Sequence, residues 1–367
     1  MIVWLLLPLL AACNPSTETS GPAAKEERSA PKNIILLIGD GMGLSAVSAP
    51  FYFDDEPSNF ARFPRVSLIN TSSATHKVTD SAASGTAMST GEKTYNGAIG
   101  VDTEGVKLTN ITELVSEMGW ATGVVSTSSI THATPASFYA HVEQRGMQEE
   151  IASQLITSGI DFFAGGGTGF FKKRSDGIDL FPQAAASGFT LDTTALPEPG
   201  TLEKGKKYGF LLAQEAMPPA HMGREDFLPR ATALAIESLS ADGDGFFLMV
   251  ESSQIDWAGH ANDTEYMIAE MLDFEKVMEV ALDFAEKDGE TLVVATSDHE
   301  TGGFTLSAAP AESGGSDYRE IGPTFATGGH SATLIPVFAF GPGSKAFSGI
   351  YQNTGLFHKI RDAATSE

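Results

Sequence analysis

Seven acidic and histidine side chains have the types and spacing of metal ligands. Most of them follow short apolar runs, and they include an adjacent Asp-His pair and a D-x-x-x-H spacing. They are Asp40, Glu251, Asp256, His260, Asp298, His299 and His330. Carboxylate and imidazole ligands without cysteine suit zinc that performs hydrolysis, and a site of oxygen ligands alone suits magnesium.

Any one of these residues has a simpler explanation. A single aspartate after a strand more often caps a helix, and a single histidine is usually a satisfied core or surface residue. The set is informative because Asp40, Glu251 and Asp298 follow successive apolar runs. In an open parallel sheet the carboxyl ends of the strands lie at one edge, where ligands gather. The sequence therefore predicts one shared metal site at that edge.

A candidate nucleophile, Ser81, lies in the run TDSAASGTA (79–87). The small residues after Ser81 would let a helix start close to the sheet, with free N–H groups and the positive helix end beside a bound phosphate. Metal coordination can activate a serine hydroxyl without a histidine base. Because such runs are also common in packed small-residue helices, Ser81 by itself is an even choice between the two interpretations.

The elements that must position these residues follow from an alternation of β-rich runs and helical stretches. The runs are 33–38, 121–126, 160–164, 245–250, 290–296 and 335–340. This alternation predicts an α/β fold with a doubly wound, largely parallel central sheet and helices on both faces. Residues 262–287 carry Met and Phe at a spacing of three to four, which predicts an amphipathic helix capped by Asn262 or Asp263. Segments 168–230 and 301–330 are rich in Gly, Pro and polar residues and are expected to be surface excursions.

The chain is strongly acidic. Its 367 residues include 23 Lys and Arg against 47 Asp and Glu, a formal net charge of −24. No cluster of basic residues stands out, which argues against nucleic acid as a specific partner. Bound metal cations would supply the local positive charge that an anionic substrate needs.

The single cysteine, Cys13, follows the apolar run 2–10 and ends the sequence Leu-Ala-Ala-Cys. This sequence resembles a bacterial lipobox, although no Lys or Arg precedes the run. We therefore expect a signal peptide at 1–12, a lipidated N-terminus and flexible tether at 13–31, and a folded domain at 32–367. The protein would be exported to the periplasm or cell surface and anchored to the membrane through Cys13. The alternatives are a cleaved but unlipidated signal and an ordinary core segment.

The sequence lacks the motifs of three other classes of protein. A dinucleotide-binding fold would carry G-x-G-x-x-G after its first strand. Gly39, Gly41 and Gly43 do not complete this motif, because position 44 is Leu44. No G-x-x-x-x-G-K-[ST] loop occurs, which argues against a P-loop nucleoside triphosphatase. Ser81 lies between Asp80 and Ala82, so it lacks the G-x-S-x-G context of a Ser-His-Asp esterase.

Six motifs occur in the order found in alkaline phosphatases, and the chain resembles that family over about residues 33–345. They are IGDGMG (38–43), TDSAASGTA (79–87), THATPASFYAHVEQR (131–145), ESSQIDWAGH (251–260), SDHETGG (297–303) and GGH (328–330). The resemblance implies two zinc ions and one magnesium ion. The first zinc would take Asp256, His260 and His330, the second Asp40, Asp298, His299 and the Ser81 oxygen, and magnesium Asp40, Thr134 and Glu251.

The resemblance also implies an activity. Ser81 would attack a phosphate monoester, and water would then hydrolyse the phosphoserine, a reaction suited to phosphate scavenging outside the cytoplasm. Arg145 would hold two phosphate oxygens with its planar fork, for which lysine lacks the geometry, and Asp80 would orient Arg145. The resemblance further implies a homodimer. The rival interpretations are a phosphodiesterase or sulfatase on the same scaffold and a non-catalytic lipoprotein that binds metal or phosphate.

Two positions divide the family, and this chain has His132 and Trp257 where some bacterial members have aspartate and lysine. We interpret His132 as a partner of a water on the magnesium ion, with direct zinc binding as the alternative. A tryptophan lacks the ammonium that would hold phosphate through water. Trp257 therefore predicts weaker product binding and faster release.

Overall fold

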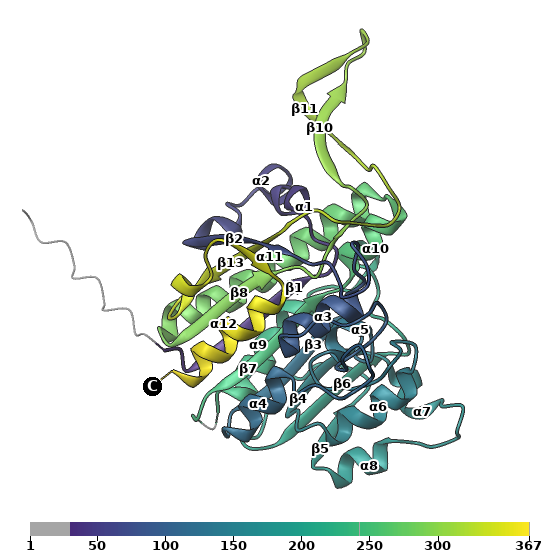
Figure 1. The fold of residues 1–367 in the computed structure, drawn as a ribbon, viewed down its shortest axis with the longest axis vertical. Helices are drawn as coiled ribbons and strands as arrows, with labels where there is room; N and C mark the ends of the chain where they lie inside the picture. The colour runs from purple at the N-terminus through teal and green to yellow at the C-terminus, as the bar shows by residue number, and fades with distance from the viewer. Residues whose placement is uncertain (1–29, 242, 367) are drawn as a thin grey trace, which may run out of the picture.

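Ten strands form one sheet in the computed structural model, which describes residues 30–241 and 243–366 (Figure 1). They are β1 (Asn33–Gly39), β2 (Arg65–Asn70), β3 (Ala121–Ser129), β4 (Phe162–Gly166), β5 (Phe189–Asp192), β6 (Lys207–Ala213), β7 (Phe246–Ser252), β8 (Thr291–Thr296), β13 (Ile335–Phe340) and β14 (Ile350–Gln352). Their order across the sheet is β14-β2-β13-β8-β1-β7-β3-β4-β6-β5, and of these ten only β13 is antiparallel to its neighbours. The predicted largely parallel α/β fold is confirmed.

The central strand β1 shows why helices must cover both faces of this sheet. All seven of its residues are buried. Ile34, Leu36 and Ile38 belong to one hydrophobic cluster, whereas Ile35 and Leu37 belong to another. Successive side chains of a strand point to opposite faces, so a continuously apolar strand needs an apolar layer on each side.

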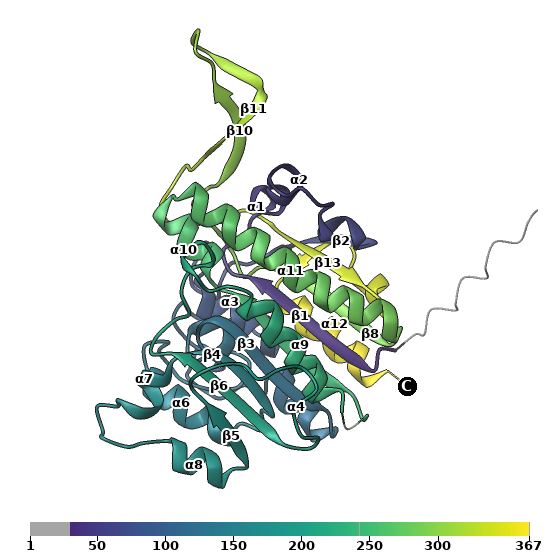
Figure 2. The same cartoon turned by 180° about the vertical axis from the view of Figure 1, so that it is seen from behind.

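Helices supply these two layers (Figure 2). One face packs against α3 (Ser81–Thr90), α4 (Ile111–Glu117), α6 (Gln148–Thr157) and α12 (Thr354–Thr365). The other packs against α9 (Phe227–Leu239), α10 (Gln254–Ala261) and α11 (Thr264–Asp288). The predicted amphipathic helix is α11, and the cap is Asp263, whose side chain accepts a hydrogen bond from the Tyr266 N–H. Within the described part of the chain, no helix has both the length and the apolar character to cross a membrane.

The two predicted surface excursions differ. The interpretation of 168–230 as surface alone is wrong, because β5 and β6 extend the sheet beside β4. The apolar run around Phe210 and Leu211 is buried, but its Lys-rich and Gly-rich flanks hide it in the sequence pattern. In 301–330, a hairpin of β10 (Thr305–Pro310) and β11 (Ser316–Thr324) projects from the body (Figure 1).

The remaining elements are short. They are α1 (Leu44–Ser48), α2 (Pro50–Phe53), α5 (Ala133–Ala136), α7 (Thr168–Lys172), α8 (Phe181–Ala186), the 3-10 helices η1 (Asn59–Arg62), η2 (Ala220–Met222) and η3 (Ser344–Ala346), and the paired strands β9 (Glu300–Thr301) and β12 (His330–Ser331). The predicted signal peptide, Cys13 and nearly all of the tether lie outside the described residues.

Candidate active site

The predicted ligands gather at the carboxyl ends of adjacent central strands. Asp40 follows β1, Glu251 lies near the end of β7, and Asp298 and His299 follow β8. Since β8, β1 and β7 are neighbours in the sheet, these side chains reach one place. Three groups of potential ligands lie there, each with ligand atoms within 4.8 Å of one another: Asp256, His260 and His330; Asp40, Asp298 and His299; Asp40, His132 and Glu251.

The first group consists of Asp256 and His260 from α10 and His330 from β12. Asp256 Oδ1 lies 3.4 Å from His260 Nε2 and 3.6 Å from His330 Nε2. Each Nδ1 lies 2.8 Å from a backbone carbonyl, that of Gly328 for His260 and that of Thr79 for His330. Carbonyls only accept, so Nδ1 carries the proton and Nε2 a lone pair. Two lone pairs 3.1 Å apart beside a carboxylate fit a cation.

The second group is completely buried. His299 Nε2 lies 3.5 Å from Asp40 Oδ1, 3.2 Å from Asp298 Oδ2 and 3.2 Å from Ser81 Oγ. Burial raises the pKa of Asp40 well above its usual value, with Asp298 adding to the shift, and burial lowers the pKa of His299 to about 3. Both oxygens of Asp40 and Oδ2 of Asp298 have no hydrogen-bond partner. Buried acceptors of this kind fit a metal ion.

Apart from the imidazole of His132, the third group presents oxygen atoms. Glu251 Oε2 accepts hydrogen bonds from Ser126 Oγ at 2.5 Å and Ser253 Oγ at 2.6 Å, whereas Oε1 has no partner. The buried hydroxyl of Thr134 also lacks one. Burial raises the pKa of Glu251 to about 7. Together with Asp40, these free oxygens form the kind of donor set that magnesium takes.

Ser81 is the first residue of α3, and the whole helix is buried. Asp80 precedes it as the N-cap and accepts from the Ala83 N–H at 3.0 Å. A Cβ on Gly85 would lie 2.7 Å from Ser137 Oγ, so glycine is needed for α3 to pack this closely on the α5 segment. The small residues thus bring a helix N-terminus, with Ser81 on it, to the metal groups.

Arg145 lies between two side chains that fix its guanidinium. Asp80 Oδ2 accepts from Nη1 at 3.1 Å, and His132 Nε2 lies 3.1 Å from Nη2. Burial, together with the nearby Arg145 charge, lowers the pKa of His132 to about 3, so the neutral ring accepts this hydrogen bond. The Trp257 ring meets the His132 ring edge-on, with 6.1 Å between centroids. All thirteen predicted site residues therefore lie around these three groups of ligands: Asp40, Asp80, Ser81, His132, Thr134, Arg145, Glu251, Asp256, Trp257, His260, Asp298, His299 and His330.

Sequence reasoning missed several hydroxyl groups that contact the ligands. Ser126 and Ser253 donate to Glu251, and Thr301 donates to Asp256. Ser253 and Thr301 stand inside the motifs ESSQIDWAGH and SDHETGG, next to predicted ligands. Small polar residues inside a ligand motif are the signal that could have identified them.

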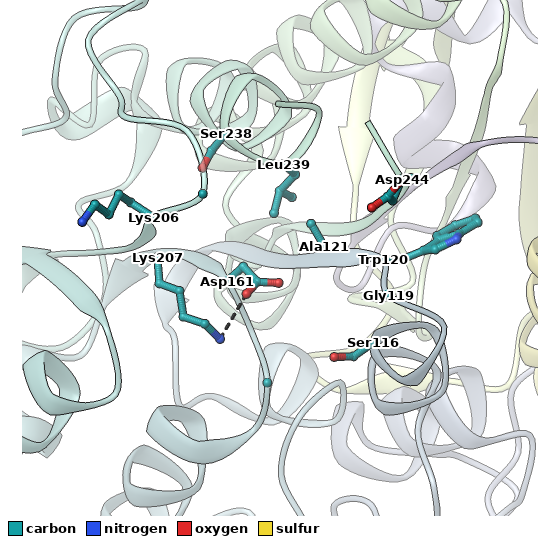
Figure 3. A pocket seen from close by; sticks show the side chains of 13 residues that line it. Ser116, Gly119, Trp120, Ala121, Asp161, Lys206, Lys207, Ser238, Leu239 and Asp244 are labelled. Carbon is teal, nitrogen blue, oxygen red and sulfur yellow. Dashed lines mark ion pairs between the residues drawn. The ribbon is translucent and has the colours of Figure 1, made fainter. Parts of the chain in front are cut away.

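A hollow of about 390 Å³ lies at the opposite ends of the strands, where β3, β4, β6 and β7 begin (Figure 3). Trp120 and Leu239 line it, together with an ion pair of 3.0 Å between Asp161 and Lys207. No predicted site residue lines this hollow. Its carboxylates are Asp161, paired with Lys207, and the solvent-exposed Asp244, whereas those at the other edge of the sheet are buried.

Comparisons with known proteins identify the family. The alkaline phosphatase family model matches residues 31–318. Alkaline phosphatase 3 of Bacillus subtilis is 34% identical over 90% of this chain and 88% of its own length, and alkaline phosphatase of Escherichia coli is 31% identical over 90% and 86%. The solved structure of alkaline phosphatase from the Antarctic bacterium TAB5 is 53% identical, with a TM-score of 0.91 over 93% of this chain and 100% of that one. A histidine-to-aspartate mutant of the TAB5 protein, equally similar, has magnesium bound in its M3 site. The chain therefore belongs to the alkaline phosphatase family and is a metal-dependent hydrolase of phosphate monoesters.

Proposed function

We propose that the chain hydrolyses phosphate monoesters through a phosphoserine on Ser81, with two zinc ions and one magnesium ion, in phosphate scavenging outside the cytoplasm. One observation supports this most. Ser81 Oγ lies 3.2 Å from His299 Nε2, beside buried carboxylate oxygens without partners and at the N-terminus of a buried helix. A serine there can be activated without a general base of its own.

The donor atoms support the choice of metals. The first group offers two imidazoles and a carboxylate, and the second offers His299, Asp40, Asp298 and the Ser81 oxygen, which are sets that suit zinc. Asp40, Thr134 and Glu251 offer oxygen alone, which suits magnesium. When bound, these ions would lower the pKa of the serine hydroxyl and of water and would neutralise charge on the phosphate oxygens.

The chain's own residues carry the rest of the reaction. The Ser81 oxygen bonds to phosphorus as the bond to the ester oxygen breaks, and water then cleaves the phosphoserine to release phosphate. Arg145, held by Asp80, directs its fork at two phosphate oxygens. Backbone N–H groups at the start of α3 add fixed positive dipoles, so charge that develops on the phosphate meets groups already in position.

His132 has two candidate roles at the third group. In one it holds a water on the magnesium ion, and in the other a ring nitrogen binds zinc directly. We favour the first, because His132 Nε2 already faces Arg145 at 3.1 Å. Metal analysis of the wild type and of His132→Asp tests this: one magnesium per chain in both supports the water-holding role, whereas a third zinc in the wild type contradicts it.

Replacement of Ser81 tests the mechanism. We expect Ser81→Ala to lower turnover of a chromogenic phosphate monoester at alkaline pH on the order of 10³-fold or more. Ser89→Ala is the matched control, because Ser89 lies on the same helix, is equally buried and donates to the Ser137 carbonyl. Acid quenching followed by mass spectrometry should find phosphate on the wild-type peptide that contains Ser81. Unimpaired turnover in Ser81→Ala would overturn the mechanism.

Parallel assays separate the rival functions. Wild-type protein with zinc and magnesium should hydrolyse a phosphate monoester much faster than the matching diester or sulfate ester. A preference for the diester would favour a phosphodiesterase, and a preference for the sulfate ester would favour a sulfatase. Metal binding without turnover of any ester would favour a non-catalytic binding protein.

We also propose that the protein is exported and anchored through Cys13, outside the cytoplasm where phosphate esters are scavenged. The lipobox-like sequence before Cys13 supports this. Cys13→Ala should move the protein from the detergent phase to the aqueous phase and abolish labelling by a radioactive fatty acid. Labelling that persists in the variant would contradict lipidation at this residue.

We further propose a homodimer. The projecting hairpin and α1–α2 border a cleft of about 450 Å³, and large side chains around it are exposed, including Tyr318 at 90% and Tyr52 at 64%. Exposed apolar surface of this kind marks contact sites. Light scattering after size exclusion should give twice the chain mass for the wild type and a lower mass for Tyr318→Asp. A monomeric wild type would exclude the dimer.

A further inference from the structure

One hydroxyl group contacts both proposed zinc sites. Thr301 Oγ1 lies 2.5 Å from Asp256 Oδ1 in the first group and 3.2 Å from His299 Nδ1 in the second. The side chain is completely buried, so no solvent competes for these contacts. The sequence resemblance assigns no role to Thr301.

The direction of each hydrogen bond follows from the chemistry of the partners. An ionised Asp256 only accepts, so the Thr301 O–H must donate to Asp256 Oδ1. The Thr301 oxygen then accepts the Nδ1–H of His299. This leaves the His299 Nε2 lone pair facing Asp40, Asp298 and Ser81, as a ligand to the second ion requires.

Close packing fixes the position of Thr301. Its N–H donates to the Gly41 carbonyl at 3.1 Å, and Thr301 pairs with His330 across β9 and β12. A Cβ on Gly41 would lie 2.9 Å from Thr301 Oγ1 and one on Gly259 would lie 3.0 Å from Thr301 Cβ. Glycine at both positions lets the backbone approach Thr301 this closely.

We propose that Thr301 is a positioning residue that joins the two zinc sites: it orients the Asp256 carboxylate and sets the tautomer of His299 through one hydroxyl. The inference depends on the proposed function in one respect, namely the assignment of zinc to the first and second groups of ligands. Its consequence is that loss of the hydroxyl weakens both sites together. A threonine that merely satisfies its own hydrogen bonds would not affect metal affinity in this way.

Isosteric replacement tests the proposal. Thr301→Val removes the hydroxyl with little change in shape and should weaken zinc binding at both sites by about 10–100-fold, the usual cost of losing an outer-shell partner. Thr301→Ser keeps the hydroxyl and should remain within a few-fold of the wild type. Thr301→Ala, which cannot overpack the site, repeats the loss if Thr301→Val fails to fold.

The measurement is zinc affinity of the metal-free protein, titrated against a chromophoric chelator, with cobalt absorption spectra to report ligand geometry at each site. Thr232→Val is the matched control, because Thr232 is buried in α9 and its hydroxyl donates to the Leu228 carbonyl at 2.8 Å. Unchanged affinity in Thr301→Val and Thr301→Ala, or weakening at one site alone, overturns the proposal. Because the readout is metal binding, a wild type that binds zinc but hydrolyses no monoester counts against the proposed function alone.

Discussion

Among the described residues, the carboxylates around Arg224 and those at the strand ends are both buried, but they differ in their source of positive charge. Glu270 and Asp273 of α11 contact Arg224, whose Nη2 lies 2.5 Å from Glu270 Oε2 and 2.8 Å from Asp273 Oδ2. All three side chains are at most 5% exposed. Asp40 and Asp298 are equally buried, yet neither forms an ion pair with an arginine or lysine of the described residues.

The difference separates a structural cluster from a functional one. A buried charge without a partner is costly, so a chain keeps such charges where a ligand compensates them. In the Arg224 cluster both carboxylates have a cationic partner within the chain, and this contact holds the loop before α9 to α11. The acidic groups at the strand ends become balanced only when cations bind. The strongest tests of this difference remove the positive charge from each cluster in turn: the metal ions from one and the Arg224 side chain from the other.

Removal of metal should produce the largest effect. We expect chelation to lower turnover on the order of 10³-fold or more, because the cations supply most of the charge stabilisation at phosphate. Zinc plus magnesium should restore activity, and neither ion alone should do so fully. Far-UV circular dichroism should stay close to that of the loaded protein, since the Arg224 cluster needs no metal. Full activity after verified metal removal would show that the strand-end carboxylates do not depend on bound cations.

Removal of the Arg224 guanidinium should instead lower the stability of the fold. Arg224→Met leaves Glu270 and Asp273 buried without compensation, which typically costs about 3–5 kcal/mol of unfolding free energy. Turnover per folded molecule should change little. Urea unfolding together with active-site titration measures the two quantities separately. A variant as stable as the wild type would contradict the stabilising role of Arg224. A variant that folds but has lost activity would show that the two clusters are not independent.

The sequence predicted one of these clusters and not the other, for a physical reason. The metal ligands stand in short motifs directly after apolar strands, and parallel strands bring their ends together whatever the intervening length. Arg224 meets its partners only through the packing of a loop on α11, and nothing local marks that contact. The hydroxyl of Ser126 was missed for the same reason, since its partner lies 125 residues away.

The fold shows the same limit. The six strands predicted from apolar runs are present, because burial on both faces leaves a continuous apolar signal. The edge strand β5 was missed because a short, partly exposed strand, buried only at Phe189, leaves little such signal. Register and edge position depend on contacts between distant segments, which single-sequence patterns do not contain.

Burial of Glu251 also predicts a pH dependence for the metal-free protein. Burial raises the pKa of Glu251 to about 7, whereas an unfolded glutamate titrates near about 4.3. Between these values the folded state retains a proton that the unfolded chain has lost, so the free energy of unfolding falls as pH rises.

We expect the melting temperature of the metal-free wild type to fall on the order of 2 °C per pH unit in this range. Glu251→Gln removes the group and should flatten the slope. Metal binding requires the ionised carboxylate, so stabilisation by added metal should grow with pH. Calorimetry of both proteins measures the slopes, and identical slopes would contradict the role of Glu251.

The smallest expected effect comes from giving the site a fixed cation of its own. Trp257 stands edge-on to His132, where a lysine ammonium could hold phosphate through water. Trp257→Lys should therefore tighten inhibition by phosphate on the order of 5-fold, which corresponds to about 1 kcal/mol. Tighter product binding should lower kcat if phosphate release limits turnover. Trp257→Met removes the ring without adding charge, and equal tightening there would assign the change to the lost ring. Unchanged inhibition in Trp257→Lys would show that, unlike Arg224 in its cluster, a fixed cation at this position contributes nothing beyond what the metals already supply.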